Sequence, residues 1–145
     1  MKFKSKIYLD YDDILSMCHN ITYDVSKIKP DLIVGITRGG LLPALHLSHQ
    51  LERPMMTIQW QTRDDSKCEY NTVLQSLIDA GKTVVFVDDI NDTGRTFSEI
   101  SKRYHCERPN VHFISLVMKT ETNYPATAAL SLQDERWIVF PWEKD

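Results

Sequence analysis

This sequence has few cysteines, no net positive charge and no long apolar run. The three cysteines, Cys18, Cys68 and Cys106, are odd in number and far apart, which excludes a zinc-binding spacing and a disulfide framework. A net charge of -3 leaves no basic footprint of the kind that binds nucleic acid. No apolar run is long enough to span a membrane or to form a signal peptide. We therefore expect a cytoplasmic protein with no nucleic-acid partner and no membrane partner.

The chain of 145 residues has the length of one domain, and no repeat or low-complexity segment divides it. Segments 32–36, 83–87 and 111–118 are apolar on both faces and rich in β-branched residues, which is typical of buried parallel strands. Further strands are expected over 6–9 and 55–61, and helices over about 14–28, 41–51 and 97–104, while 73–77 fits either a strand end or a short helix. We expect a single α/β domain over residues 1–145, with a parallel sheet and helices on both faces.

The most informative stretch joins a buried strand to a helix. The strand over 83–87 ends in Asp88 and Asp89, Asp92 follows, and residues 93–96 (Thr-Gly-Arg-Thr) lead into the helix. Ligands of open α/β sheets bind at the carboxyl ends of the strands. A helix N-terminus that follows small and hydroxyl residues binds anions. The sequence therefore predicts a phosphate-binding turn directly after an acidic pair.

The chemistry of this stretch indicates a sugar phosphate. The backbone N–H groups of residues 92–96 can cradle a phosphate, and Gly94 permits unusual backbone angles and a close approach. The hydroxyls of Thr93 and Thr96 add donors. Carboxylates beside a phosphate repel it unless they face vicinal sugar hydroxyls or a Mg²⁺ ion. We expect the phosphate on the turn and the sugar diol on the acids.

The run from Asp88-Asp89 through two spacer residues to Asp92-Thr93-Gly94-Arg95-Thr96 resembles the signature of the type I phosphoribosyltransferases, which bind 5-phosphoribosyl 1-pyrophosphate (PRPP). The resemblance implies that Asp88 and Asp89 bind the ribose hydroxyls directly or through Mg²⁺, with Asp89 as the metal ligand. It implies that Asp92 is the catalytic acid–base, facing N7 of a purine. It also implies that the 5′-phosphate is bound by the residues of the phosphate turn, Asp92, Thr93, Gly94, Arg95 and Thr96.

A second candidate anion site follows the strand over 32–36. Thr37, Arg38, Gly39 and Gly40, here called the glycine loop, combine exposed backbone N–H groups with a cation just before a helix. Taken alone, an Arg-Gly-Gly loop is equally compatible with a plain connection. Placed one strand-helix unit before the acid pair, it resembles the pyrophosphate loop of the purine-using members of the family. Two anion sites match the two phosphate-bearing ends of PRPP.

Two further segments resemble the base-binding parts of 6-oxopurine phosphoribosyltransferases. Lys119 follows the strand over 111–118, where the resemblance implies a lysine that holds the exocyclic oxygen of the base. Trp137 and Ile138, with Pro141-Trp142 downstream, are similar to the segment that stacks on the purine and accepts hydrogen bonds from its edge. A hydrophobic cap on the core is the alternative role of Trp137. The resemblance implies the type I phosphoribosyltransferase fold, with a small hood built from the terminal segments.

The implied reaction moves phosphoribosyl from PRPP to N9 of hypoxanthine, guanine or xanthine, with Mg²⁺ as cofactor and a homodimer or homotetramer as the assembly. The polar segment 62–71 is expected to be a mobile loop, in which Arg63 or Lys67 could contact pyrophosphate. Two alternatives stay open. One is a non-catalytic PRPP-binding or nucleotide-binding regulator, against which the retention of Asp92 argues. The other is a transferase for another base, against which Lys119 and Trp137 argue.

Overall fold

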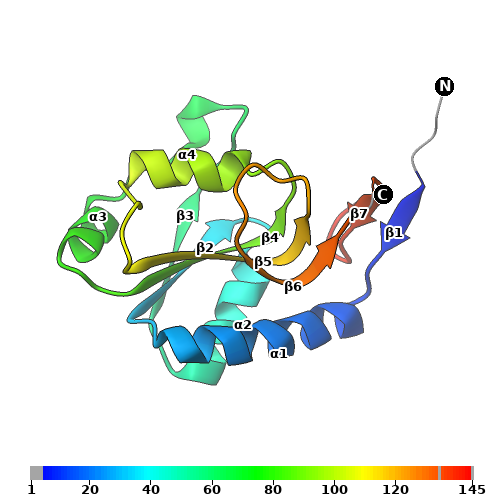
Figure 1. Cartoon of the computed structure of the whole chain (residues 1–145), viewed down its shortest axis with the longest axis horizontal. Coiled ribbons are helices and arrows are strands. Elements are labelled where there is room, and N and C mark those ends of the chain that lie inside the picture. Colours follow the sequence, from blue (N-terminus) through cyan, green and yellow to red (C-terminus); the bar gives the residue numbers. More distant parts are fainter. Residues whose placement is uncertain (1–4, 134, 145) are drawn as a thin grey trace.

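The computed structural model describes residues 5–133 and 135–144, in an α/β order (Figure 1). The strands are β1 (Lys6–Tyr8), β2 (Leu32–Thr37), β3 (Met55–Gln59), β4 (Val84–Asn91), β5 (Val111–Lys119), β6 (Thr127–Leu132) and β7 (Trp137–Val139). The helices are α1 (Tyr11–Ile28), α2 (Leu41–Leu51), α3 (Thr72–Asp79), α4 (Arg95–Arg103) and a short 3₁₀ helix, η1 (Asp65–Lys67). No helix in these described ranges is both long and apolar enough to cross a membrane.

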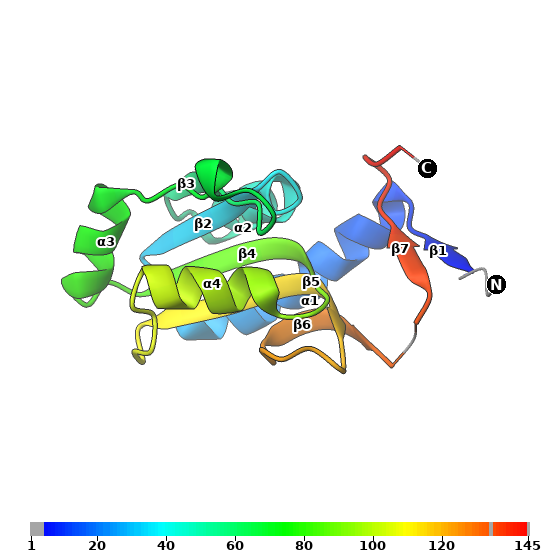
Figure 2. The ribbon, with the colours of Figure 1, turned by 90° about the horizontal axis from the view of Figure 1, so that it is seen from above.

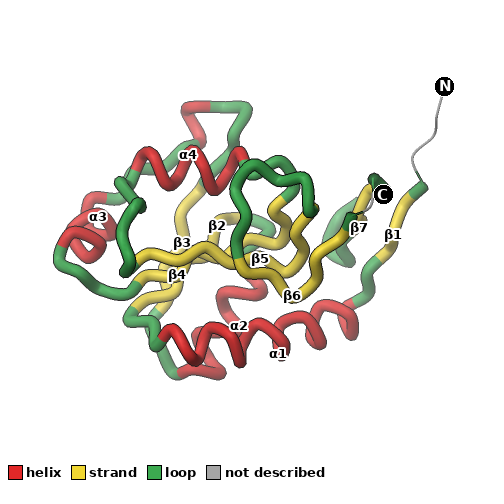
Figure 3. The backbone as a smooth tube through the Cα atoms, viewed as in Figure 1, coloured by secondary structure: helices red, strands yellow, loops and turns green. Residues whose placement is uncertain are grey.

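Five strands form one parallel sheet in the order β3-β2-β4-β5-β6. Because all five point the same way, the loops that follow them gather at a single edge of the sheet (Figure 3). The central strand β4 lies between β2 and β5, so the segments that follow these three strands are neighbours. The predicted parallel α/β fold is confirmed.

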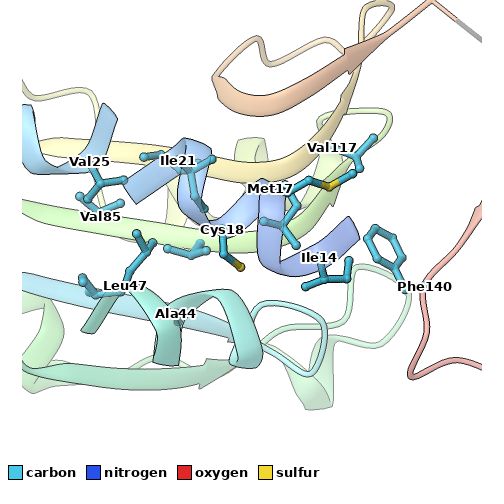
Figure 4. Packing of buried hydrophobic residues seen from close by; sticks show 14 of the residues in the cluster. Ile14, Met17, Cys18, Ile21, Val25, Ala44, Leu47, Val85, Val117 and Phe140 are labelled. Atoms are coloured by element: carbon cyan, nitrogen blue, oxygen red, sulfur yellow. The ribbon is translucent and has the colours of Figure 1, made fainter. Parts of the chain in front are cut away.

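Helices cover both faces of this sheet (Figures 1 and 2). On one face, α1 and α2 pack against the central strands, and Ile21, Leu47 and Val85 belong to that cluster (Figure 4). On the other face, Phe97 of α4 packs in a cluster with Phe86 of β4. Both sides of β4 are therefore buried, which explains why its first residues are apolar without alternation.

The terminal segments form a small two-stranded hood. β1 pairs in parallel with β7, with Lys6 opposite Trp137 and Tyr8 opposite Val139. Figure 2 shows this pair standing apart from the main sheet, beyond the ends of β4 and β5. Backbone bonds extend the pairing, since Leu9 N donates to Val139 O at 3.0 Å. The hood predicted from the terminal segments is therefore present.

Several boundaries differ from those expected. β4 continues through the acid pair to Asn91, because Asp88, Ile90 and Asn91 keep their register with β5. The ambiguous segment 73–77 is helical, since Asn71 caps α3 by accepting from Leu74 N at 3.0 Å. β6 was not predicted. Its exposed and half-buried residues lie at the edge of the sheet, where the pattern of a buried strand is lost.

Two of the cysteines are buried and unreactive in character. Burial raises the pKa of the Cys18 thiol to about 11 and that of the Cys106 thiol to about 12. The thiolate is the nucleophilic form of cysteine, and burial disfavours it. Neither residue is therefore suited to nucleophilic chemistry at neutral pH.

Candidate active site

The carboxyl edge of the sheet brings together the polar segments that the sequence singled out. The neighbouring strands β2, β4 and β5 end there in the glycine loop, the acid pair and Lys119. The hood stands beyond the same edge (Figure 2). Residues far apart in the chain, such as Arg38 and Trp137, thus line one region, which we treat as the candidate active site.

The acid pair, Asp88 and Asp89, lies near the carboxyl end of strand β4, and both carboxyls have raised pKa values. Asp89 N donates to Asp88 Oδ1 at 2.8 Å, and Ile90 N donates to Asp89 Oδ1 at 2.8 Å. Burial, the charge of Asp89 and a hydrogen bond between the two carboxyls raise the pKa of Asp88 well above its usual range. Burial, with repulsion from Glu143, raises the pKa of Asp89. Such a pair favours a partner that supplies protons or positive charge.

The phosphate turn, residues 92–96, starts helix α4 and borders a cavity of about 170 Å³, here called the turn cavity. Gly94 is the N-cap of α4 with a φ of 88°, a conformation that side chains rarely adopt. Having no side chain, it cannot cap the first N–H groups of the helix. The helix N-terminus and the hydroxyl-bearing Thr93 and Thr96 therefore suit an anion. The Arg95 guanidinium turns toward Glu99, with Nε 2.8 Å from Oε2.

Three cavities meet at Asp89. It borders the turn cavity, a second cavity of about 360 Å³ under the hood, and a third of about 880 Å³ beside the glycine loop. We call the second the hood cavity and the third the loop cavity. Asp92 borders both the turn cavity and the hood cavity. One extended ligand could therefore pass Asp89 with its three parts in three separate cavities.

The glycine loop lies against the acid pair. A Cβ at Gly40 would overlap the backbone oxygens of Val87 and Ile36, so this packing admits only glycine there, whereas a Cβ at Gly39 would overlap the carboxylate of Asp89 and require that side chain to move. Arg38 and Gly39 border the loop cavity. The peptide bond between residues 37 and 38 is cis.

Two polar groups of the glycine loop are used inside the protein rather than presented to the cavity. Thr37 Oγ1 donates to Ile58 O at 3.2 Å, and Gly40 N donates to Ile36 O at 2.8 Å. Neither Thr37 nor Gly40 borders one of the three cavities. Arg38 and Gly39 are therefore the members of this loop that are best placed to meet a ligand.

Lys119, Trp137 and Ile138, the residues predicted to bind the base, all border the hood cavity. Lys119 is 9% exposed, and its Nζ donates to Arg136 O at 2.8 Å. This bond ties the end of β5 to the hood segment. Trp137 is 58% exposed whereas Ile138 is buried, so the indole is not a cap on the core. An exposed aromatic ring at the rim of a cavity is suited to stacking.

The segment expected to be a mobile loop has structure of its own. Trp60 and Cys68 form an antiparallel bridge, and η1 lies between them. The far end is held by Tyr104, whose hydroxyl donates to Glu69 O at 2.6 Å and accepts from Asn71 N at 2.9 Å. Neither Arg63 nor Lys67 borders the three cavities around Asp89.

The residues around Asp89 fit a Mg²⁺ ion. The paired carboxyls provide the oxygen ligands that Mg²⁺ prefers, and a cation would stabilise their charged form, which burial and the neighbouring carboxylates disfavour. Within the described ranges, no group of three or more His, Cys, Asp or Glu residues could enclose a metal on its own. Mg²⁺ commonly completes its coordination shell with water and substrate phosphates, so an acid pair that borders a cavity is sufficient protein ligation for it.

Sequence reasoning missed several residues of this region. Asn91, read as a spacer, is buried, and its amide is bonded to Thr122 and Tyr124. A polar amide at the end of an apolar strand was the available signal. Three glutamates also border the hood cavity, and nothing in the sequence around them indicated this role; they are Glu121, Glu135 and Glu143.

Fold and site together define an α/β protein in which an acid pair, a helix N-terminus and a small hood lie at the carboxyl edge of a parallel sheet. A family model described as "Phosphoribosyl transferase domain" matches residues 5–144. A xanthine-guanine phosphoribosyltransferase from Cereibacter sphaeroides is 30% identical over 117 residues, which is 77% of this chain and 68% of that protein. This chain belongs to the phosphoribosyltransferase family, type I, as the sequence indicated.

Two solved structures share the fold closely. The crystal structure of a purine phosphoribosyltransferase from Pyrococcus horikoshii Ot3 has a TM-score of 0.75 and 28% identity, covering 97% of this chain and 95% of that one. A xanthine-guanine-hypoxanthine phosphoribosyltransferase from Helicobacter pylori has a TM-score of 0.73 and 24% identity, covering 95% of this chain and 93% of that one. The second likeness bears on the fold alone.

Proposed function

We propose that this phosphoribosyltransferase uses PRPP and a 6-oxopurine base, either hypoxanthine, guanine or xanthine, and releases pyrophosphate and a nucleoside 5′-monophosphate. The observation that carries the proposal is the meeting of three cavities at Asp89. In this assignment the turn cavity takes the 5′-phosphate, the loop cavity takes pyrophosphate, and the hood cavity takes the base. The ribose then lies over the acid pair, where its hydroxyls can donate to carboxylates.

In the proposed reaction the bond from ribose C1 to pyrophosphate breaks as the bond from C1 to N9 of the base forms. The ribose becomes positively charged in the transition state, and the carboxylates of Asp88 and Asp89 lie where they stabilise that charge. Arg38 and the backbone of Gly39 offset the growing negative charge of pyrophosphate. Asp92, on the wall between turn and hood cavities, is assigned the proton transfer at N7.

Mg²⁺ is assigned to Asp89, where it would neutralise charge on pyrophosphate and orient the ribose diol. The hood cavity supports this assignment through its charge. The side chains that border it include five carboxylates and only two cations. The carboxylates are Asp89, Asp92, Glu121, Glu135 and Glu143, and the cations are Lys119 and Arg136. The pyrophosphate and 5′-phosphate of PRPP, which are assigned to the two other cavities at Asp89, are repelled by these carboxylates unless a cation accompanies them.

Lys119 supports the choice of a 6-oxopurine. An ammonium group has donors and no acceptor, whereas the three 6-oxopurines present an acceptor oxygen at C6 and adenine presents a donor amino group. Hydrogen bonds to charged groups contribute about 1.5–3 kcal/mol, so this contact should discriminate by about tenfold to a hundredfold. Trp137 stacks on either base and does not separate them.

The proposal is tested by incubating the protein with PRPP, Mg²⁺ and a panel of bases while pyrophosphate release is followed. We expect turnover of hypoxanthine, guanine or xanthine, and little turnover of adenine. Lys119→Met should lose most activity toward hypoxanthine and narrow the gap to adenine. Lys102→Met, at an exposed position on α4, serves as the control and should keep the wild-type preference.

Each failure in this assay has a different meaning. Equal turnover of adenine and hypoxanthine by the wild type would show that Lys119 does not read C6, and would refute the base class alone. PRPP binding without pyrophosphate release on any base would favour a regulatory protein that binds PRPP without acting on it. Activity with orotate or uracil instead would move the assignment to a pyrimidine substrate.

We also propose that two copies of the chain associate through the face beside the glycine loop. The loop cavity is bordered by the exposed side chains of Tyr11, Leu41 and Leu45, which are 58%, 46% and 48% exposed. A contiguous apolar surface of this kind marks an interaction site. Because the same cavity includes Arg38, a partner copy on this face would also cover the proposed pyrophosphate site.

Leu45→Glu is expected to dissociate the assembly, since it places a charge in the apolar face and burying that charge is costly. Light scattering should give at least twice 16.9 kDa for the wild type and 16.9 kDa for the variant. Val73→Glu, on α3 at a position that is 62% exposed, is the matched control and should keep the wild-type mass. A wild type that is monomeric at working concentration would contradict this proposal.

A further inference from the structure

Asn91 is a buried amide at the end of strand β4, between the acid pair and the phosphate turn. It is 4% exposed. Its Nδ2 donates to Tyr124 O at 2.7 Å, and its Oδ1 accepts from Thr122 Oγ1 at 2.8 Å. Donor and acceptor of the side chain therefore both bind one segment, the loop of residues 120–126 between β5 and β6. We call this segment the brace loop.

The brace loop lies directly against the phosphate turn (Figure 3). Asn123 N donates to Thr93 O at 2.9 Å, and Tyr124 N donates to Thr122 Oγ1 at 3.2 Å. A Cβ at Gly94 would come within 2.6 Å of Tyr124 N and 2.7 Å of Thr122 Oγ1. Loop and turn are thus in van der Waals contact, with a backbone hydrogen bond across the contact and no room for a side chain.

The Thr122 hydroxyl sits at the centre of this arrangement. It is 7% exposed, donates to Asn91 and accepts from Tyr124 N, so one hydroxyl links strand β4 to the backbone of the brace loop. The N-cap residue Gly94 has no side chain to cap α4, and within the turn Thr93 Oγ1 accepts from Arg95 N at 3.2 Å. The turn therefore has one side-chain bond of its own, and it is further held by the brace loop, which Asn91 and Thr122 fix in place.

A phosphate cradle binds well when its N–H groups already point at the ligand, because little ordering is then left to be done on binding. We propose that Asn91 and Thr122 are positioning residues, which preorganise the phosphate turn by fixing the brace loop against it. The inference rests on the assignment of the 5′-phosphate to that turn. Neither side chain needs to touch the ligand, and neither takes part in proton transfer.

Ribose 5-phosphate tests this directly, because it carries the 5′-phosphate without pyrophosphate or base. Its dissociation constant is measured by calorimetry for the wild type, Asn91→Leu and Thr122→Val. Leucine and valine keep the approximate shape of the side chains they replace but cannot make these hydrogen bonds. We expect affinity for ribose 5-phosphate to fall about tenfold or more in each variant, the change expected when about 1.4 kcal/mol of preorganisation is lost.

Two further variants separate positioning from general stability. Thr122→Ser keeps the hydroxyl and should retain most of the wild-type affinity. Gln75→Leu removes another buried amide, which is 8% exposed and donates to Tyr104 O at 2.9 Å. Tyr104 is the C-cap of α4, at the opposite end of the helix from the phosphate turn. Gln75→Leu should lower the melting temperature and leave binding of ribose 5-phosphate unchanged.

The binding measurements on these variants either support the inference or overturn it. Weaker binding in Asn91→Leu and Thr122→Val, with Thr122→Ser and Gln75→Leu near wild type, supports the inference. Wild-type affinity in Thr122→Val, or an equal loss in Gln75→Leu, overturns it while the proposed phosphate site stands. Because Thr122→Val is the milder change, it decides the matter if Asn91→Leu does not fold. A wild type that binds PRPP but not ribose 5-phosphate would remove the 5′-phosphate from the turn and the inference with it.

Discussion

Asp92→Asn is expected to lower kcat for phosphoribosyl transfer by about 10²–10⁴-fold, the usual contribution of general acid–base catalysis. Asp92 borders both the turn cavity and the hood cavity, so a carboxyl there can reach a base whose sugar is held over the acid pair. Asparagine keeps the shape of the side chain and loses the ability to carry the proton. The KM for PRPP should change little, because the backbone of the turn is retained.

Pre-steady-state and steady-state rates of pyrophosphate release, measured with saturating base over a range of PRPP concentrations, check this prediction. Asp24→Asn, an exposed change on α1, is the matched control and should keep the wild-type rate. Wild-type turnover in Asp92→Asn would remove the residue from the mechanism. A large rise in the KM for PRPP with unchanged kcat would assign Asp92 to phosphate binding instead.

Gly94→Val is expected to abolish PRPP binding and to destabilise the fold. From the sequence alone, we expect a side chain here to obstruct the phosphate and to leave the protein folded. The structure adds two sources of destabilisation. Residue 94 has a φ of 88°, which strains any side-chain-bearing residue, and a Cβ there would lie only 2.6 Å from Tyr124 N. Holding a non-glycine residue in such a conformation costs about 1–3 kcal/mol. Overpacking against the brace loop adds about 1–3 kcal/mol.

A comparison with Gly81 separates the two costs. Gly81 has a φ of 84°, close to that of Gly94, but a Cβ there would meet no atom within 4 Å. Gly81→Ala therefore carries the conformational cost alone, and Gly94→Ala carries this cost together with the clash. Urea unfolding should show a greater loss of stability for Gly94→Ala, by about 1–3 kcal/mol. Equal losses in the two variants would mean that the brace loop moves aside without cost.

The local sequence determined the parts of this protein that depend on short-range chemistry. An apolar run followed by Asp88 and Asp89 predicts a buried strand with acids close to its carboxyl end, because strand burial and charge placement are both visible within a few residues, although the strand itself continues to Asn91. The Thr-Gly-Arg-Thr run predicts the turn into α4 for the same reason, since positive φ and helix capping are local properties. The glycine loop after β2 was predictable in the same way. Parallel strand order then brings these segments to one edge.

Only the tertiary structure decided how distant segments complete the site. Asn91 reads as a spacer in the sequence, but its side chain is bonded to Thr122 and Tyr124, which lie 31 and 33 residues further along the chain. Lys119 was predicted to meet a base, but its bond to Arg136 O depends on the hood. The hood itself arises from pairing of the first and last strands. Such contacts are fixed by the packing of the whole chain, because a hydrogen bond between residues far apart leaves no periodic pattern around either partner.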